Sequence, residues 1–260
     1  MISILLAAYQ SEALLKKVFF KGLAKHTRVP FEVILYDNGG NGDLKSQAID
    51  LTVIGDGENV GLNQALNACA ASAKYDYFYL PHTDMYLMPG WDLALLEVAN
   101  SLSSDSFLLC SRSVEPTKGH TDFHIIRDYG SSADGFDEKK LIEDFRQHQD
   151  PAIVTGYRMP FFLHRKLWNK MGGVDPHYFS YCTDDDLVQT AYDQGVRRFG
   201  MVMGSLVYHL QGKSNQSQEV DRNSEWPYEY FIKKWKQKYP DASEPSTWHP
   251  RLIPWYQRVK

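Results

Sequence analysis

His82 and Asp84 follow directly after a run of aromatic and apolar residues. The run from Tyr77 to Leu80 predicts a strand buried on both faces, and Pro81 should end it because proline cannot donate to a sheet ladder. Residues two apart in an extended segment point to the same side, so the imidazole and the carboxylate should face one spot. In an open α/β sheet, that spot is where ligands bind. The alternative is a loop in which Asp84 caps the next turn and His82 is solvated.

Other polar side chains also lie where predicted strands end. Apolar runs predict strands over residues 2–8, 31–36 and 51–54, and amphipathic or alanine-rich segments predict helices over 11–23 and 62–73. Strands that alternate with helices imply right-handed crossovers and a largely parallel sheet. Tyr9, Asp37 and Asn59 should therefore gather at one edge, beside the pair described above.

The composition indicates a globular protein and gives no reason to expect nucleic-acid binding. The 260 residues are 43% hydrophobic, which suffices for a substantial core, and 28 basic against 32 acidic residues give a net charge of −4. Cys69, Cys110 and Cys182 are odd in number and far apart, which argues against a disulfide framework or a zinc cluster and favours a reducing compartment. Because there is no signal peptide and no apolar run near the ~20 residues of a membrane span, we expect a cytoplasmic protein without a transmembrane segment.

Six motifs in order resemble those of glycosyltransferase family 2, whose members have the GT-A nucleotide-diphosphosugar fold. The resemblance runs from Ile2 to about Ser214, and the motifs are SILLAAYQ (3–10), LYDNG (35–39), NVGLNQALN (59–67), FYLPHTDMYLMPGW (78–91), GGVDPHYFSYCTDDDL (172–187) and VYHLQGKS (207–214). They are similar to the family patterns V-S-I-V-I-P-T-Y-N, V-V-D-N-G-S, N-x-G-x-x-x-x-x-N, D-x-D before P-G-W, G-G-F-D…F-x-Y-x-E-D-x-D-L and V-x-H-x-x-G-x-S. Each motif alone is weak, whereas six in this order are specific.

The resemblance implies the fold and its division. We expect an α/β fold of GT-A type with a mostly parallel central sheet flanked by helices. Residues 1–214 would form the catalytic domain, of which 1–92 are the nucleotide-binding half and 93–214 the acceptor half. The residues beyond the resemblance, 215–260, predict a lid over the donor, a helix over 228–239 and a tail rich in proline and tryptophan that packs back on the domain. The alternative is a tail that binds a partner or a membrane surface.

The resemblance also implies a nucleotide-diphosphate sugar as the donor. Tyr9 would stack on the base and Asp37 would accept a hydrogen bond from the base N–H, a pairing that suits uracil or thymine and so favours UDP or dTDP over GDP. The alternative for Tyr9 is a plain core aromatic. The expected nucleotide-binding residues are Ala8, Tyr9, Asp37, Asn59, Gly61, Asn67 and Thr83.

A divalent cation would offset the negative charge that grows on the departing diphosphate. By resemblance Asp84, the last acid of the D-x-D motif, is the expected ligand, and His209 would complete the site from the far end of the domain. His82 stands where the family has its first acid and is the third expected ligand. Since Mn²⁺ tolerates imidazole, we expect Mn²⁺ rather than Mg²⁺. The alternative for His209 is a satisfied histidine at a strand end.

For the acceptor, a hydroxyl of a glycan or other glycoconjugate, the resemblance implies an inverting mechanism with one aspartate as base. Asp184 aligns with that base. Asp185 and Asp186 follow it at the predicted start of a helix, where the helix dipole favours carboxylates in any case. Thr183 stands where the family has glutamate, a change that leaves the base in place. The expected acceptor-side residues are Asp186, Tyr181 and Trp91.

Two other functions remain open from the sequence. A nucleotidyltransferase on a similar sheet would need a glycine-rich, basic phosphate loop after the first strand, and residues 7–12 contain neither glycine nor lysine. A nucleotide-sugar or glycan binding protein with weakened catalysis is suggested by His82 and Thr183, which replace acids of the family pattern.

Overall fold

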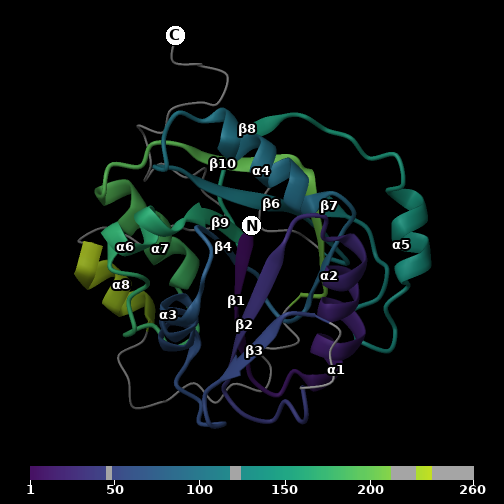
Figure 1. The fold of residues 1–260 in the computed structure, drawn as a ribbon, viewed down its shortest axis with the longest axis horizontal. Helices are drawn as coiled ribbons and strands as arrows, with labels where there is room; N and C mark the ends of the chain where they lie inside the picture. Colours follow the sequence, from purple (N-terminus) through teal and green to yellow (C-terminus); the bar gives the residue numbers. More distant parts are fainter. Residues whose placement is uncertain (45–48, 118–123, 212–226, 236–260) are drawn as a thin grey trace.

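The computed structural model describes residues 1–44, 49–117, 124–211 and 227–235, which form one mixed sheet with helices on both faces (Figure 1). The strand order is β3-β2-β1-β4-β9-β6-β10-β5, with β7 beside β6 and β8 beside β10. The strands are β1 (Ile2–Ala8), β2 (Phe31–Asp37), β3 (Leu51–Ile54), β4 (Tyr77–Leu80), β5 (Met85–Leu87), β6 (Leu108–Glu115), β7 (Ile125–Ile126), β8 (Ile153–Thr155), β9 (Phe161–His164) and β10 (Phe199–His209). The predicted α/β class is confirmed.

Helices cover both faces of this sheet. They are α1 (Glu12–Leu14), the π-helical turn η1 (Leu15–Phe19), α2 (Phe20–His26), α3 (Leu62–Ser72), α4 (Trp91–Ser101), α5 (Glu138–Asp144), α6 (Arg165–Met171), α7 (Thr183–Asp193) and α8 (Pro227–Trp235). In Figure 1, α3, α6, α7 and α8 lie together on one side of the strands, and α1, α2 and α5 lie on the other. Side chains of β1 alternate between two cores: Ile4 and Leu6 belong to the cluster that includes α2 and α4, whereas Leu5 belongs to the one that includes α3, α6 and α7.

The first four strands in the sheet order, β3, β2, β1 and β4, pair in parallel. The strands predicted over 2–8, 51–54 and 77–80 have the expected bounds, and β2 is one residue longer because Asp37 still pairs with Ala8. The chain therefore leaves β1 and β2 at the same level of the sheet, and the parallel arrangement predicted for this half is confirmed.

The second half of the sheet is mixed, so the largely parallel sheet that we expected is present only in the first half. β9 is antiparallel to β4 and β6, while β10 runs parallel to β6 but antiparallel to β5 and β8. β5 pairs with β10, and β9 pairs with β4 and β6, so each lies beside strands that are distant from it in the sequence. The direction of these pairings is therefore not determined by a local strand-helix-strand connection.

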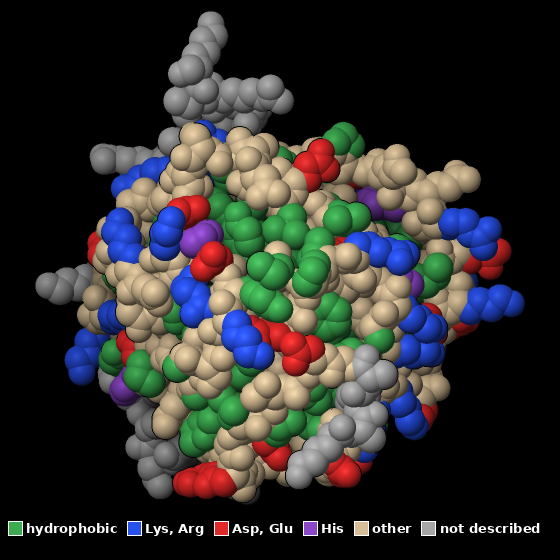
Figure 2. All heavy atoms as spheres, viewed as in Figure 1, with side chains coloured by type: hydrophobic (Ala, Val, Ile, Leu, Met, Phe, Trp, Pro, Cys, Tyr) green, Lys and Arg blue, Asp and Glu red, His purple; other side chains and the backbone are tan. Residues whose placement is uncertain are grey.

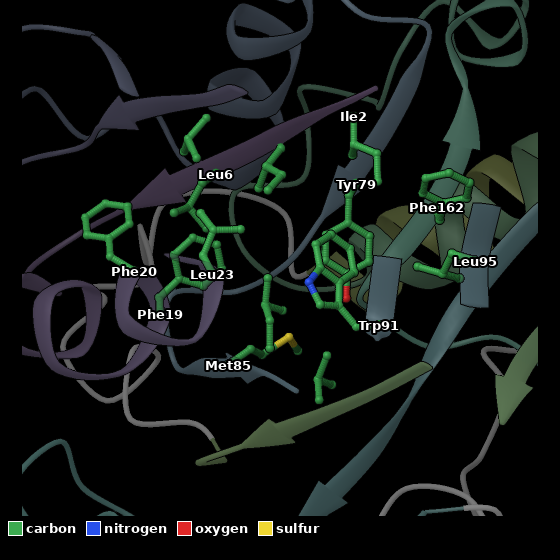
Figure 3. Packing of buried hydrophobic residues seen from close by; sticks show 14 of the residues in the cluster. Ile2, Leu6, Phe19, Phe20, Leu23, Tyr79, Met85, Trp91, Leu95 and Phe162 are labelled. Atoms are coloured by element: carbon green, nitrogen blue, oxygen red, sulfur yellow. The ribbon is translucent and has the colours of Figure 1, made fainter. Parts of the chain in front are cut away.

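Trp91 is part of the core rather than of a binding surface. Figure 3 shows its indole against the ring of Tyr79, with ring centroids 4.4 Å apart. The side chain is fully buried, and its Nε1–H donates to Thr27 Oγ1 at 3.3 Å. The expectation that Trp91 contacts an acceptor is therefore wrong, because both the ring and its polar atom are engaged inside the protein.

Both basic and acidic side chains are scattered over the face drawn in Figure 2, with apolar side chains exposed between them. Within the described ranges, no helix has the length and apolar character that crossing a bilayer requires. Of the predicted C-terminal features, α8 accounts for the first part of the helix expected over 228–239. The predicted lid and the proline-rich tail fall on residues outside the described ranges.

Candidate functional site

The carboxyl ends of β1 and β2 are tied together by Asn38 and Asn41. The Asn38 N–H donates to the Ala8 carbonyl at 2.8 Å, and the Asn41 side chain donates to the same carbonyl at 2.9 Å. Asn41 is buried, and its Oδ1 accepts from the Ser11 N–H at 2.9 Å. Asn41 is not among the residues expected from the sequence, where its place in a turn-forming run was the only signal. These bonds hold the loop after β1 against the loop after β2.

Tyr9 and Asp37, which we expected to hold the nucleotide base, are partly exposed at this edge. Asp37 Oδ1 accepts from the Gly39 N–H at 2.8 Å, so part of its hydrogen-bonding capacity shapes the loop. Gly39 has a φ of +108°, and a Cβ there would lie 2.6 Å from the Gly57 carbonyl oxygen, so this close approach requires glycine. The loop leaves Tyr9 and Asp37 at neighbouring places on the sheet edge.

Asn59, Gly61 and Asn67 shape the backbone around α3. Asn59 Oδ1 accepts from the Gly61 N–H at 3.1 Å. A Cβ on Gly61 would lie 2.7 Å from the Phe179 ring, so its small size permits this contact. Asn67 exchanges two hydrogen bonds with the backbone of Val174, at 2.7 and 3.0 Å. The Asn67 amide is thus engaged within the protein.

Thr83 joins the turn after β4 to the end of β1. Its buried hydroxyl donates to Ser11 Oγ at 3.1 Å, and Ser11 Oγ donates to the Tyr9 carbonyl at 2.7 Å. Ser11 precedes α1, as the sequence suggested, but its side chain makes no capping hydrogen bond because the hydroxyl is engaged in this chain.

His82, Asp84 and His209 form a group that could hold a metal ion. One ligand atom from each lies within 4.8 Å of the others. Two antiparallel strands bring these residues together, because the pairing of β5 with β10 sets Met85 opposite His209. The Leu210 N–H also donates to the Asp84 carbonyl, at 3.0 Å. Residues from positions 82 and 209 of the chain therefore meet at one point.

Residues 82–84 form a turn rather than the extended segment that we expected. The Met85 N–H donates to the His82 carbonyl at 3.3 Å, so the backbone reverses between the two residues. His82 and Asp84 do converge, but because of this reversal and not because of the alternation of an extended strand.

Asp84 is 1% exposed, and neither of its carboxylate oxygens has a hydrogen-bond partner in the described part of the chain. His209 Nε2 lies 3.5 Å from Asp84 Oδ2. A buried charge is costly unless it is paired or coordinates a metal. The imidazoles beside this carboxylate supply nitrogen ligands of the kind that transition-metal ions accept. The donor set therefore fits a divalent cation.

The charges in this group stabilise one another. Burial alone would raise the pKa of Asp84, but His209 and His82 hold that pKa below its ordinary value. Burial would lower the pKa of His209, whereas Asp84 and Glu115 raise it to about 10. Burial lowers the pKa of His82. In the protein alone, Asp84 and His209 therefore form an ion pair.

Glu115, which the sequence did not lead us to expect, contacts His209 from the side opposite Asp84. Its Oε1 lies 3.0 Å from His209 Nδ1, and its Oε2 lies 3.1 Å from His124 Nδ1. Burial would raise the pKa of Glu115, but the two histidines lower it to about 2. The sequence carried no clear signal for it, because Ser111, Arg112 and Ser113 make the second half of β6 polar.

Asp184, Asp185 and Asp186 occupy the first turn of α7 and face different neighbours. Arg158 Nη1 donates to Asp184 Oδ2 at 3.0 Å and lies 3.9 Å from Asp185. The Asp184 side chain is 27% exposed, whereas Asp185 and Asp186 are buried. Asp184 is thus the acid of the three whose side chain stays partly accessible, and Arg158 holds its carboxylate.

Asp186 holds α8 rather than an acceptor. Its carboxylate accepts from Trp235 Nε1 at 2.8 Å and from Lys234 Nζ at 3.0 Å. Lys234 also donates to Asp175 Oδ2 at 2.8 Å. Because the Asp186 carboxylate is buried and engaged by α8, the acceptor-side role expected for it is replaced by a structural one.

Tyr181 and Thr183 lie beside the start of α7. Tyr181 is partly buried and packs against a cluster that contains Tyr178 and Phe231. The buried Thr183 hydroxyl donates to Asn63 Oδ1 at 2.7 Å, which ties α7 to α3. Only Tyr181 of this pair has a side chain that remains partly accessible.

The chain matches the family model described as Glycosyl transferase family 2 over residues 3–171. No curated protein matches the chain.

Solved structures with the same fold include two of S. aureus TarS 1–349. One has a TM-score of 0.58 and 15% identity, and the match covers 80% of this chain and 60% of that chain. The other, in complex with UDP-GlcNAc, has a TM-score of 0.58 and 13% identity, and the match covers 84% of this chain and 61% of that chain. A structure of GalNAc-T7 with UDP, GalNAc and Mn²⁺ has a TM-score of 0.58 and 16% identity, and the match covers 80% of this chain and 43% of that chain. This chain thus spans about 60% of the length of the TarS chains, and at these identities the likeness confirms the GT-A-type fold alone.

Asp186→Asn should lower the free energy of unfolding by about 1–3 kcal/mol, because it removes a charged acceptor from a buried contact with Lys234 and Trp235. Urea denaturation followed by tryptophan fluorescence measures the change. Asp193→Asn is the matched control, since Asp193 lies exposed at the end of the same helix, and it should change stability by no more than ~0.5 kcal/mol. Unaltered stability of Asp186→Asn would show that α8 does not depend on this contact.

Proposed function

This chain belongs to glycosyltransferase family 2, and from that premise we propose that it transfers a sugar from a nucleoside-diphosphate sugar to a hydroxyl of a carbohydrate or other glycoconjugate. The observation that carries the proposal is the buried Asp84 carboxylate, which faces two imidazoles and has no hydrogen-bond partner among the described residues. Tyr9 and Asp37 lie where the neighbouring parallel strands end, so groups for a base and for a cation share one end of the sheet.

A uridine or thymidine nucleotide is the donor carrier that we propose, in preference to GDP. Tyr9 would stack on the base, and Asp37 would accept a hydrogen bond from the base N–H. Two similar structures support this choice, because one holds UDP-GlcNAc and the other holds UDP with GalNAc and Mn²⁺.

Asp84, His209 and His82 would hold a divalent cation. When bound, the cation offsets the negative charge that develops on the diphosphate leaving group. One carboxylate with two imidazoles favours Mn²⁺ over Mg²⁺, because Mg²⁺ prefers oxygen ligands. The presence of Mn²⁺ in the similar GalNAc-T7 structure supports that preference.

Asp184 would act as the base of an inverting transfer. Its carboxylate would take the proton from the acceptor hydroxyl while that oxygen bonds to the anomeric carbon and the bond from this carbon to the diphosphate oxygen breaks. The Arg158 guanidinium, 3.0 Å from Asp184 Oδ2, orients the carboxylate. Partial exposure keeps Asp184 accessible to an acceptor.

The two halves of the catalytic domain would bind different substrates, the first the donor and the second the acceptor. Residues 1–92 carry Asp37 and Asp84 and would bind the donor, and residues 93–214 carry Asp184 and would bind the acceptor. The support for this division is that the parallel strands of the first half end beside the donor groups, whereas α7 belongs to the second half.

A reducing compartment, the cytoplasm, is part of the proposal. Cys69, Cys110 and Cys182 are free, buried thiols. Burial raises the pKa of Cys69 and of Cys110 to about 12, so both thiols stay protonated and unreactive. Thiols kept in this state are typical of proteins that do not depend on disulfides.

Binding of UDP should depend on a divalent cation. In calorimetric titrations the unaltered protein should bind UDP at least about tenfold more tightly with Mn²⁺ than with EDTA, a difference of ~1.4 kcal/mol. Asp84→Ala should remove that difference, because it removes the buried carboxylate of the cation site. Asp76→Ala, which changes an exposed acid just before β4, is the control and should keep the difference. Equal affinity in Mn²⁺ and EDTA for the unaltered protein would contradict the cation site.

Asp37→Ala should weaken UDP binding and leave its dependence on Mn²⁺ unchanged, because the proposed partner of Asp37 is the base. The loss of one hydrogen bond to a charged group corresponds to ~1.5–3 kcal/mol, or about 10- to 150-fold in the dissociation constant. Asp50→Ala, an exposed carboxylate before β3, should bind UDP normally. Calorimetry with UDP decides the matter, and an unchanged affinity for Asp37→Ala would refute the base contact.

Asp184→Asn should lower turnover by at least ~100-fold and leave donor affinity almost unchanged, since proton transfer matters in the transition state and not in the bound donor. The measurement is release of UDP from UDP-GlcNAc in Mn²⁺, with water as the acceptor. Asp185→Asn, beside the same arginine, should retain far more activity. If the unaltered protein binds the donor and releases no UDP, a binding protein without catalysis becomes the better description.

A further inference from the structure

Glu115 lies in a row of charged residues that three neighbouring strands create. The pairing of β6 with β10 ends at Val114, one residue before Glu115. The pairing of β5 with β10 sets His209 opposite Met85, one residue after Asp84. The His209 ring therefore has a carboxylate on each side. Its Nδ1 lies 3.0 Å from Glu115 Oε1, and its Nε2 lies 3.5 Å from Asp84 Oδ2.

The contacts of Glu115 determine which nitrogen of His209 carries a proton. Glu115 is buried, with His209 Nδ1 at 3.0 Å from Oε1 and with His124 Nδ1 and Gln211 Nε2 both at 3.1 Å from Oε2. An ionised carboxylate accepts hydrogen bonds and donates none. The hydrogen bond to Glu115 therefore requires a proton on His209 Nδ1. In the neutral ring, Nε2 is then the nitrogen with a lone pair, and it is the one that faces Asp84.

We propose that Glu115 is a positioning residue for the cation site: it fixes the ring of His209 and selects the tautomer that presents Nε2 to a divalent cation. This inference rests on the proposed function, because it takes His209 as a cation ligand. A histidine ligand commonly donates its other N–H to a carboxylate, which fixes the tautomer and increases the basicity of the ligating nitrogen. The alternative is a Glu115 that only ties β6 to the end of β10.

Glu115→Gln separates these two roles. The carboxamide has nearly the same size, but it can either donate to Nδ1 or accept from it, so it no longer dictates the tautomer. The affinity for Mn²⁺, measured by calorimetry without nucleotide, should fall about 10- to 100-fold. Gln211→Ala is the matched control, because it removes a different hydrogen bond to the same carboxylate, and its Mn²⁺ affinity should stay close to that of the unaltered protein.

A second measurement uses the unaltered protein and does not require the variant to fold. With Zn²⁺ bound, ¹H–¹⁵N spectra of the histidine rings should show His209 protonated at Nδ1 and metal-bound at Nε2. Coordination through Nδ1 would overturn the proposal, and so would an unchanged Mn²⁺ affinity in Glu115→Gln. Both outcomes leave the cation site itself intact. If the unaltered protein binds neither Mn²⁺ nor Zn²⁺, the cation site of the proposed function fails and this inference fails with it.

Discussion

The removal of one carboxylate, that of Asp84, from water is the constraint on which the site depends. An isolated buried charge is unfavourable by several kcal/mol, and only an opposite charge or a metal ion offsets such a cost. The imidazole of His209 supplies that opposite charge at 3.5 Å, and it is itself held between two carboxylates. Asp84, His209 and Glu115 therefore form a row of alternating charges in which the central member depends on both neighbours.

The pairing of β5, β10 and β6 positions this row, with Asp84 in the turn that leads into β5. β10 is central because it pairs with β6, β5 and β8 at once. Its register with β6 shifts between Val202 and Leu206, so the alignment of its last residues depends on that irregularity. Gly204 lies within it, where a Cβ would come within 2.9 Å of the Asp150 carbonyl oxygen. Since a slip of one residue sends a side chain to the other face of a sheet, the ligand geometry at His209 is decided several residues upstream of it.

The sequence predicted the parts of this structure that local patterns determine. Strands followed by helices predicted the parallel half, and polar residues just past strand ends placed Tyr9 and Asp37 at its edge. The mixed half could not be predicted in the same way, because the neighbours of β9 and β10 depend on pairings between distant segments. Asn41 and Glu115 were missed for a related reason, since each gains its role only from a remote partner.

The first turn of α7 has a consequence for how such sites change over time. Successive residues of an α-helix are rotated by about 100°, and this rotation alone directs Asp184 toward Arg158 and Asp186 toward Lys234. An insertion of one residue between Asp186 and Leu187 would keep all three aspartates and yet rotate each by about 100° relative to Leu187 and Val188, whose burial fixes the orientation of the helix. The sequence would still contain every acid. The spacing between the acids and the buried face of α7, and not the acidic triplet itself, is therefore the heritable quantity that keeps Asp184 beside Arg158.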